Sequence, residues 1–251
     1  MASPTLDDLL ARARDLLAGA TRAAVLSGAG ISAESGVPTY RGVGGVWNAF
    51  NAEDLASPDG FARDPDRVWQ WHNERRMALA HIEPNAGHRA LAALQRLVET
   101  RGGRFDLVTQ NIDGLHQAAG SQGVLELHGT ILAVRCSACP ARRHIGFEPA
   151  DTIPRCEACG SLMRPAIVWF GEMLPQDVWL QAADAVTGCD VFMTVGTSAV
   201  VYPAAGLIEM AVAAGARSIE VNLEPTPASD LVDVSLEGKA GELLPQLVAH
   251  S

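Results

Sequence analysis

The feature that most constrains the fold is the stretch at residues 25 to 42, VLSGAGISAESGVPTYRG. An apolar run, typical of a buried strand, leads directly into a Gly-Ala-Gly turn. A strand that ends at such a turn leaves backbone N–H groups pointing beyond the edge of its sheet, where they favour an anion such as a pyrophosphate. The stretch therefore predicts a strand, a tight turn and an anion site at a sheet edge.

The turn matches the spacing G-x-G-x-x-[G/A] at Gly28, Gly30 and Ala33. In that pattern the first glycine permits the turn, the second lets phosphates approach, and the third residue keeps the next helix close to its strand. By itself the pattern also suits a turn that binds nothing. The sequence SGVP at residues 35 to 38 disfavours a long helix, because glycine and proline are poor helix residues. We therefore expect a loop, suited to closing over a ligand.

Apolar, β-rich runs alternate with helical patterns along the rest of the chain. Nearly continuous apolar strands separated by helices are typical of a parallel sheet covered on both faces. We expect strands at residues 23 to 28, 105 to 111, 123 to 129, 189 to 198, 217 to 225 and 231 to 238, and helices at 5 to 19, 85 to 100, 175 to 187, 203 to 215 and 239 to 249. The predicted fold class is α/β, with a doubly wound Rossmann-like parallel sheet.

Two insertions interrupt this alternation. Residues 37 to 84 are rich in Trp, Arg and His, and residues 133 to 166 contain four of the five cysteines. We expect the insertions to form a smaller lobe, with a helical segment and a zinc ribbon, across a cleft from the sheet. Residues 1 to 36, 85 to 132 and 167 to 251 would then form the Rossmann-like domain.

The four cysteines of the second insertion have metal-ligand spacing. Cys136 and Cys139 form one CxxC pair, and Cys156 and Cys159 form another, sixteen residues further on. In a reducing compartment such pairs hold zinc more often than they form disulfides. Four thiolates fill a tetrahedral coordination sphere, so we expect a structural zinc with no catalytic role. Cys189 stands alone and is interpreted as a small buried residue, not as a nucleophile.

Charge and hydropathy limit the partners and the location. The net charge of −10 disfavours nucleic acid and suits basic, lysine-bearing proteins. No run approaches the roughly 18 apolar residues of a membrane span. The first residues, MASPTLDDLLARARDLL, have the pattern of an amphipathic helix and not of a signal peptide. We expect a cytoplasmic protein without membrane contact; the oligomeric state is not predicted.

Five of the expected strands end in glycines or polar residues. Ligands of open α/β sheets bind beyond the carboxyl ends of the strands, so these endings are the candidate site. They are Gly28, Ala29 and Gly30; Gln110, Asn111, Ile112 and Asp113; His128 and Gly129; Gly196, Thr197 and Ser198; and Asn222, Leu223 and Glu224.

Three of these residues have side chains suited to catalysis. His128 titrates near neutrality and could act as a general base, or could be a structural histidine satisfied by one backbone hydrogen bond. Asn111 could hold a hydroxyl or a water, and Asp113 could accept from a carboxamide; capping of the next helix is the alternative for both. His88 and His116 are interpreted as helix-surface or capping residues.

Several sequence blocks together resemble one known family. GAGISAESGVPTYRG, TQNIDGLH, ELHGT, the paired CxxC motifs, VWFGE, GTSAVVYPA and VNLE follow in this order over nearly the whole chain. In these blocks the chain resembles the sirtuin family of NAD-dependent protein deacylases. The resemblance implies an NAD-binding Rossmann-like domain, with NAD as co-substrate and a structural zinc. It also implies that the carbonyl oxygen of an acylated lysine attacks NAD, giving nicotinamide, free lysine and O-acyl-ADP-ribose.

The resemblance also assigns roles to single residues. His128 would deprotonate a ribose hydroxyl, Asn111 would position ribose and water, and Asp113 would bind the nicotinamide carboxamide. The phosphates and ribose would meet the strand end at Gly196, and adenosine the one at Asn222. The residues implied to contact NAD are Gly28, Ala29, Gly30, Ala33, Glu34, Tyr40, Arg41, Trp47, Gln110, Asn111, Ile112, Asp113, Gly196, Thr197, Ser198, Asn222, Leu223, Glu224 and Ala240.

The sequence WQWHNERR at residues 69 to 76 resembles the place where the desuccinylating and demalonylating branch of the family has a tyrosine and an arginine three residues apart. Arg75 matches the arginine, His72 replaces the tyrosine, and Ala56 matches a small residue that widens the acyl pocket. Arg75 would pair with a succinyl or malonyl carboxylate, with acetyl also accepted, unless it is a solvated surface residue. A protonated His72 would strengthen this preference as the pH falls.

The motif VWFGE resembles the segment that pairs with an extended acyl-lysine peptide as an added strand. It comprises Val168, Trp169, Phe170, Gly171 and Glu172. A buried core strand is the alternative interpretation. Two other functions remain open from the sequence: mono-ADP-ribosyl transfer to protein, which uses the same NAD cleavage, and a non-catalytic zinc-ribbon binding module.

Overall fold

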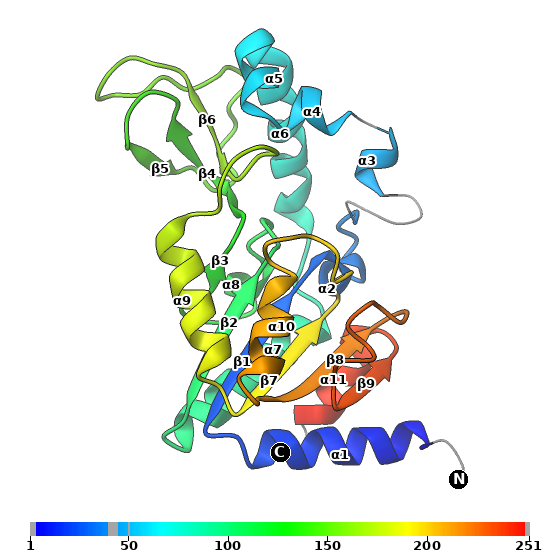
Figure 1. Cartoon of the computed structure of the whole chain (residues 1–251). Coiled ribbons are helices and arrows are strands. Elements are labelled where there is room, and N and C mark those ends of the chain that lie inside the picture. Colours follow the sequence, from blue (N-terminus) through cyan, green and yellow to red (C-terminus); the bar gives the residue numbers. More distant parts are fainter. Residues whose placement is uncertain (1–3, 40–44, 50, 249–251) are drawn as a thin grey trace.

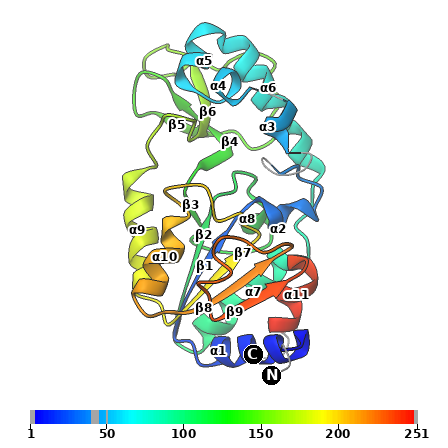
Figure 2. The same cartoon turned by 45° about the vertical axis from the view of Figure 1, so that its right-hand side comes forward.

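The computed structural model describes residues 4–39, 45–49 and 51–248. Two groups of elements lie at opposite ends of an elongated molecule (Figure 1 and Figure 2). In chain order the elements are α1 (Leu6–Ala18), β1 (Arg22–Ser27), α2 (Ala29–Ala33), α3 (Val46–Ala49), α4 (Ala52–Leu55), α5 (Pro58–Arg63), α6 (Pro65–Ala78), the 3-10 helix η1 (Leu79–His81), α7 (Ala86–Thr100), β2 (Arg104–Thr109), α8 (Leu115–Ala118), β3 (Leu125–Glu126), β4 (Gly129–Cys136), β5 (Arg142–His144), β6 (Met163–Ile167), α9 (Gln176–Thr187), β7 (Val191–Val195), α10 (Gly206–Ala213), β8 (Arg217–Asn222), β9 (Val234–Glu237) and α11 (Ala240–Val248).

The larger group is built on a six-stranded sheet with the order β3-β2-β1-β7-β8-β9. All of its neighbouring strands are parallel, which confirms the predicted doubly wound sheet. The strand order reverses between β1 and β7, so the topological switch point lies between these two strands. The strand expected at residues 123 to 129 is shorter than predicted, because the chain turns at Gly129, with φ +72°, and enters a second sheet as β4.

Helices cover both faces of this sheet. Residues of α1, α7 and α11 form one hydrophobic core with it, and residues of α9 and α10 form another on the opposite face (Figure 2). In β1, Ala23 and Val25 belong to the first core, whereas Ala24 and Leu26 belong to the second. Burial on both faces explains why the run is continuously apolar. None of the helices in the described ranges is long and apolar enough to cross a membrane.

The smaller group combines a three-stranded antiparallel sheet, β5-β4-β6, with α3 to α6. Val68 of α6 packs with Ile131 and Ile167 in one core, and Trp69 packs with Val134 in another. The two expected insertions therefore contact one another. The second insertion was expected at residues 133 to 166. The three-stranded sheet begins at Gly129, four residues earlier, and ends at Ile167, one residue later.

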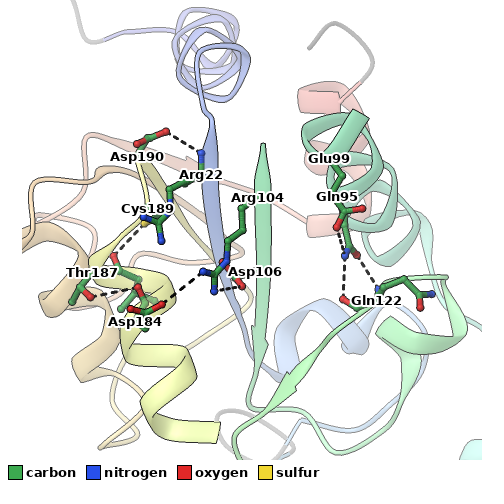
Figure 3. A network of polar contacts seen from close by, with 11 residues as sticks. Arg22, Gln95, Glu99, Arg104, Asp106, Gln122, Asp184, Thr187, Cys189 and Asp190 are labelled. Carbon is green, nitrogen blue, oxygen red and sulfur yellow. Dashed lines mark hydrogen bonds and ion pairs between the residues drawn. The ribbon is translucent and has the colours of Figure 1, made fainter. Parts of the chain in front are cut away.

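A polar network lies at the amino edge of the six-stranded sheet (Figure 3). Asp190 accepts from the backbone amide of Arg22 at 2.9 Å, and Arg104 pairs with Asp106 at 2.7 Å. Cys189 is half-buried beside this network, and burial raises the pKa of its thiol to about 11. The thiol therefore stays protonated at neutral pH, in agreement with the interpretation that it is no nucleophile.

Candidate active site at the carboxyl edge of the parallel sheet

The turn after β1 packs directly against the turn after β7. The amide of Gly28 donates to the carbonyl oxygen of Val195 at 2.9 Å, and that of Gly30 donates to Gly196 at 2.8 Å. A Cβ atom on Gly30 would lie 2.7 Å from the Cα atom of Gly196, and one on Gly196 would lie 2.3 Å from the amide nitrogen of Ile31. The glycines therefore allow two backbone turns to meet at the switch point, where sheets of this class bind ligands.

One role inferred for this turn is wrong. Ala33 is exposed at the end of the five-residue α2, so it does not hold the helix against β1. Ile31 and Ser32 face the interior instead and are buried. Asn85, which the sequence reasoning missed, anchors α2 by donating to the carbonyl oxygen of Ile31 at 2.7 Å and to Ser35 Oγ at 3.0 Å.

His128 follows β3, and the position of its ring is set by one hydrogen bond. Its Nδ1 donates to the carbonyl oxygen of Gln110 at 2.9 Å. Because a carbonyl oxygen only accepts, the neutral ring carries its proton on Nδ1 and its lone pair on Nε2. Burial lowers the pKa of His128, and the bond to Gln110 opposes this effect. A neutral imidazole with its lone pair on Nε2 is suited to act as a general base.

Asn111 and Asp113 are buried beside the glycine turn and are joined through Ser32. Nδ2 of Asn111 donates to the carbonyl oxygen of Gly28 at 3.0 Å and to Ser32 Oγ at 3.2 Å. The Ser32 hydroxyl donates to Asp113 Oδ2 at 2.7 Å, and the amide of Leu115 donates to Oδ1 at 2.9 Å. Asp113 thus accepts from the first residue of α8, whose N-cap is Gly114, whereas Asn111 Nδ2 bonds to the glycine turn and to α2. Burial raises the pKa of Asp113, and the bonds from Leu115 and Ser32 oppose this rise.

His88 and His116 are buried, so the surface interpretation of both is wrong. They are 0% and 1% exposed, and their ring centroids are 4.9 Å apart. The amide of Asn85 donates to His88 Nδ1 at 3.3 Å, so His88 does belong to a capping box; its Nε2 lies 3.3 Å from Ser32 Oγ. His116 Nε2 lies 2.8 Å from Ser27 Oγ. Burial lowers the pKa of His88 to about 4 and that of His116 to about 3.

The sequence held no local signal for the burial of these two histidines. Both contact serines of the strand and turn that predicted the site, since Ser27 ends β1 and Ser32 belongs to α2. The sequence alone does not say which distant segment folds over those serines.

The structure brings most of the other expected nucleotide-site residues to the same edge. The amide of Gly241, next to Ala240, donates to Glu34 Oε1 at 2.9 Å, and Gln110 Nε2 donates to Thr197 Oγ1 at 3.0 Å. Tyr40 and Arg41 lie outside the described residues, and of Trp47 only the backbone, in α3, is described. Strand ends at this edge also carry Ala29, Ile112, Ser198, Asn222, Leu223 and Glu224.

His72 and Arg75 lie one turn apart on α6. His72 is buried, its Nε2 donates to the carbonyl oxygen of Leu55 at 2.9 Å, and its ring stacks on Trp169 with centroids 5.8 Å apart. Burial lowers the pKa of His72 to about 3, although the bond to Leu55 opposes this. Burial thus favours the neutral form of His72 and speaks against the hypothesis that a protonated His72 contacts the acyl carboxylate. Arg75 is half-buried with its guanidinium carbon 3.4 Å from the centre of the Trp71 ring, so it is not a fully solvated residue.

The VWFGE segment connects the histidine edge to the small lobe. The amide of Val168 donates to the carbonyl oxygen of His128 at 2.9 Å, and that of Phe170 donates to Ala56 at 2.8 Å. The segment is a turn and not a strand, with Gly171 at φ +84°. The segment therefore links His128, the candidate base, to Ala56, which is expected to line the acyl pocket.

Two side chains of this segment are engaged within the protein. Trp169 is buried, with the guanidinium carbon of Arg164 3.3 Å from its ring centre. The carboxylate of Glu172 accepts from the backbone amide of Trp169 at 2.9 Å and pairs with Arg164 at 2.7 Å and with Arg135 at 2.6 Å. Glu172 thus ties the turn to β4 and β6.

The four cysteines of the small lobe form one cluster. Their Sγ atoms all lie within 4.8 Å of one another, and three pairs are 3.4, 3.6 and 3.7 Å apart. Thiolates around a tetrahedral zinc, with Zn–S bonds of about 2.3 Å, are about 3.8 Å apart. The cluster confirms the predicted ligand set of a structural zinc, formed by Cys136, Cys139, Cys156 and Cys159.

Comparisons with known proteins agree with this site. The sequence model of the Sir2 family matches residues 28–203. The NAD-dependent protein deacylase 2 of Pyrobaculum aerophilum is 47% identical over 234 residues, which cover 93% of this chain and 92% of that protein. The NAD-dependent protein deacylase of Thermus thermophilus is 48% identical over 244 residues, covering 96% and 95%.

Solved structures show the same similarity. A Sir2 homologue in complex with NAD has a TM-score of 0.89 and 44% identity, over 96% of this chain and 93% of the other. Sir2Af2 bound to a myristoylated histone peptide has a TM-score of 0.76 and 39% identity, over 97% and 96%. The chain therefore belongs to the Sir2 family.

Proposed function

We propose that this chain removes acyl groups from protein lysines in a reaction that consumes NAD, giving nicotinamide, free lysine and O-acyl-ADP-ribose. The observation that supports this most directly is the orientation of His128, whose Nδ1 is held by Gln110 so that Nε2 is the basic atom. This base stands at the sheet edge that also carries the two glycine turns. The relatives named NAD-dependent protein deacylases support the same reaction.

The residues at this edge fit a dinucleotide. The turns at Gly28 to Gly30 and at Gly196 meet at the switch point of the sheet, where folds of this class bind nucleotide phosphates. The amides of Gly28 and Gly30 donate within the protein, so they do not point at an anion as the sequence predicted. The buried carboxylate of Asp113 can accept from the nicotinamide carboxamide. Both amide hydrogens of Asn111 are used within the protein, so a ribose hydroxyl would donate to its Oδ1. NAD itself supplies a ribose carbon that becomes electrophilic as nicotinamide leaves.

His128 would take the proton of a ribose hydroxyl on Nε2. Burial lowers the pKa of His128, which favours the neutral ring that a general base requires. The attack of the acyl-lysine oxygen would be accelerated chiefly because the site holds this oxygen against the electrophilic carbon in the correct orientation. The hydrogen bond from Val168 to His128 links the peptide segment to this base, which supports such positioning.

For the acyl group, we propose that succinyl and malonyl are removed, and that acetyl is also accepted. Arg75 is half-buried on Trp71, and a guanidinium that is partly withdrawn from water forms a stronger two-pronged contact with a carboxylate. Ala56, whose side chain is only a methyl group, is buried in the same apolar cluster as Trp169, and we propose that it lines the acyl pocket. Because His72 Nε2 already donates to Leu55, the preference rests on Arg75, and uncharged acyl groups remain substrates.

We further propose that the substrate protein binds as an extended peptide along residues 168 to 172. The amides of Val168, Trp169, Phe170 and Glu172 already donate within the protein. A peptide would therefore pair with carbonyl oxygens of the segment and with the amide of Gly171. One solved relative binds a myristoylated histone peptide, which supports an acyl group carried on a peptide.

The test is NAD turnover with one peptide sequence that carries unmodified, acetyl, malonyl or succinyl lysine. We expect nicotinamide release only with the acylated peptides, with one O-acyl-ADP-ribose formed for each nicotinamide. NAD labelled in its adenosine half distinguishes the rival functions. Label transferred to protein would indicate ADP-ribosyl transfer, and no turnover with any peptide would indicate a non-catalytic binding module.

A further inference from the structure

Glu220 is a buried acid in the middle of the parallel sheet. It lies on β8, is 1% exposed, and stands in register with Thr194 of β7 and Ser235 of β9. Its Oε1 accepts from the Thr226 hydroxyl at 2.5 Å, and its Oε2 accepts from Ser229 at 2.5 Å and from Ser235 at 2.9 Å. Three hydroxyl groups therefore satisfy both oxygens of this buried carboxyl group.

Two of these donors belong to a compact turn at residues 226 to 229, which we call the 226–229 turn. The amide of Thr226 donates to Ser229 Oγ at 2.8 Å, and the amide of Ser229 donates to the carbonyl oxygen of Thr226 at 3.0 Å. Ala228 is 3% exposed and packs in the core beneath α9 and α10. The turn is thus held on its apolar side by Ala228 and on its polar side by Glu220.

The 226–229 turn follows directly on the end of β8, where Asn222, Leu223 and Glu224 stand. Nδ2 of Asn222 donates to the carbonyl oxygen of Glu224 at 2.7 Å, and only Pro225 separates Glu224 from the turn. This short connection has strand β8 on one side and the turn held by Glu220 on the other. Its position therefore depends on both attachments.

Burying a carboxyl group in the core costs desolvation free energy, and an apolar residue of similar size often gives the same stability. An apolar residue could not, however, accept hydrogen bonds from the two hydroxyl groups of the turn and from the one of β9. Thr194 Oγ1, on the other flanking strand, is buried and has no hydrogen-bond partner among the described residues. The hydroxyl contacts of the carboxylate thus come from the 226–229 turn and from β9, and not from β7.

We propose that Glu220 is a positioning residue for the nucleotide. By holding the 226–229 turn, it fixes the connection from Asn222 to Glu224, which receives the adenosine half of NAD. This inference rests on the proposed function and on the placement of adenosine at these three residues that the family resemblance implies. Glu220 itself, enclosed by hydroxyl groups, does not touch the nucleotide.

The test compares two hydroxyl donors to the same carboxylate. Thr226→Val removes the donor from the turn, and Ser235→Ala removes the donor from β9. We expect Thr226→Val to weaken ADP-ribose binding, measured by titration calorimetry, about tenfold, because the turn loses its bond to Glu220 and the amide of Ala228 loses its acceptor. It should raise KM for NAD and leave kcat and KM for the acyl peptide unchanged. Ser235→Ala should change ADP-ribose binding by less than about twofold.

Substitution of Glu220 itself adds a rescue test. Glu220→Gln keeps the shape and one carbonyl acceptor, so it should bind ADP-ribose more tightly than Glu220→Ala. If these variants do not fold, the two hydroxyl variants still decide, since each changes only one contact to the carboxylate. The proposal is overturned if Thr226→Val and Ser235→Ala weaken ADP-ribose binding equally or not at all, or if KM for the peptide rises as much as KM for NAD.

Asn222→Ala separates this proposal from the placement of adenosine. If that variant binds ADP-ribose as the wild type does, the placement is wrong and the role of Glu220 falls with it. If Asn222→Ala weakens binding while Thr226→Val does not, the placement stands and only the role of Glu220 is wrong.

Discussion

Nδ1 of His128 and the carbonyl oxygen of Gln110 are joined by a hydrogen bond of 2.9 Å. The bond places the ring proton on Nδ1 and leaves the lone pair on Nε2. The side chain of Gln110 donates in turn to Thr197 Oγ1 at 3.0 Å, in the turn after β7. Gln110 therefore connects the candidate base with the turn after β7.

Replacing His128 by asparagine should lower kcat/KM by about 10² to 10⁴, the usual contribution of a general base, and leave ADP-ribose binding unchanged. His81→Asn, at an exposed position in η1, is the matched control. Because burial lowers the pKa of His128, the acid limb of kcat/KM should have its midpoint below pH 6.5. An acid limb centred above pH 7, or an unaffected His128→Asn variant, would contradict the assignment.

Arg75→Met should reduce kcat/KM for a succinyl-lysine peptide by roughly 10-fold to 100-fold, because a two-pronged contact to a carboxylate is lost. For the acetyl-lysine peptide the change should be less than about threefold, since acetyl has no carboxylate. Arg67→Met, at an exposed position of the same helix, controls for the loss of one positive charge. An unchanged succinyl-to-acetyl ratio in Arg75→Met would show that another group selects the acyl chain.

The ratio of succinyl to acetyl activity should be constant between pH 6 and pH 8. The pKa of His72 is lowered to about 3 by burial, so its charge does not change in this range. His72→Tyr should raise the ratio, because a phenol adds a hydrogen-bond donor near Arg75. Paired assays of both peptides across this pH range measure the effect. A ratio that rises as the pH falls would mean that His72 becomes protonated.

Glu172→Gln should raise KM for the acyl peptide roughly tenfold, because Glu172 ties the proposed peptide-binding turn to Arg164 and Arg135 through charged hydrogen bonds. KM for NAD should stay unchanged, since these contacts lie in the small lobe. Glu157→Gln is the control, because Glu157 is 89% exposed and forms only a 3.8 Å surface pair. Equal effects on both KM values would indicate general loosening instead.

The free energy of unfolding should fall as the pH is lowered from 7 to 5. The pKa values of His72, His88 and His116 are lowered to about 3, 4 and 3 by burial, so the unfolded chain binds protons near pH 6.5 that the folded chain does not. This stability is fully present above about pH 6.5 and decreases toward the folded pKa values, by about 2 kcal/mol per histidine at pH 5.

Urea unfolding at the two pH values measures this loss. His72→Phe should flatten the pH dependence by about 2 kcal/mol over this range, whereas replacing the exposed His144 by glutamine should not change it. A stability that is independent of pH would show that these histidines gain protons in the folded state.

The six-stranded sheet could be predicted because its signal is local. A strand buried on both faces must be apolar at every position, as β1 is, and the helices between strands have their own periodicity. The smaller sheet was not predicted strand by strand. β5 is exposed along its length, so no apolar pattern marks it. β4 and β6 are far apart in the sequence, so their spacing does not indicate that they pair.

The candidate site could be predicted only in part for a similar reason. Strand ends place Gln110, Asn111 and His128 at one edge whatever the rest of the fold does. The burial of His88 and the contact of His72 with Leu55 depend on which distant segments pack together. Such contacts are absent from any local pattern.

The amino-acid order alone determined the parallel sheet, the glycine turn, the cysteine ligand set and the identity of the residues at the strand ends, since each depends on neighbours in the chain. Only the tertiary structure decided which nitrogen of His128 is basic, that burial lowers the pKa of His72, and that Glu172 and Glu220 hold turns. The physical reason is that protonation and hydrogen-bond partners are set by burial, and burial comes from segments far apart in the sequence.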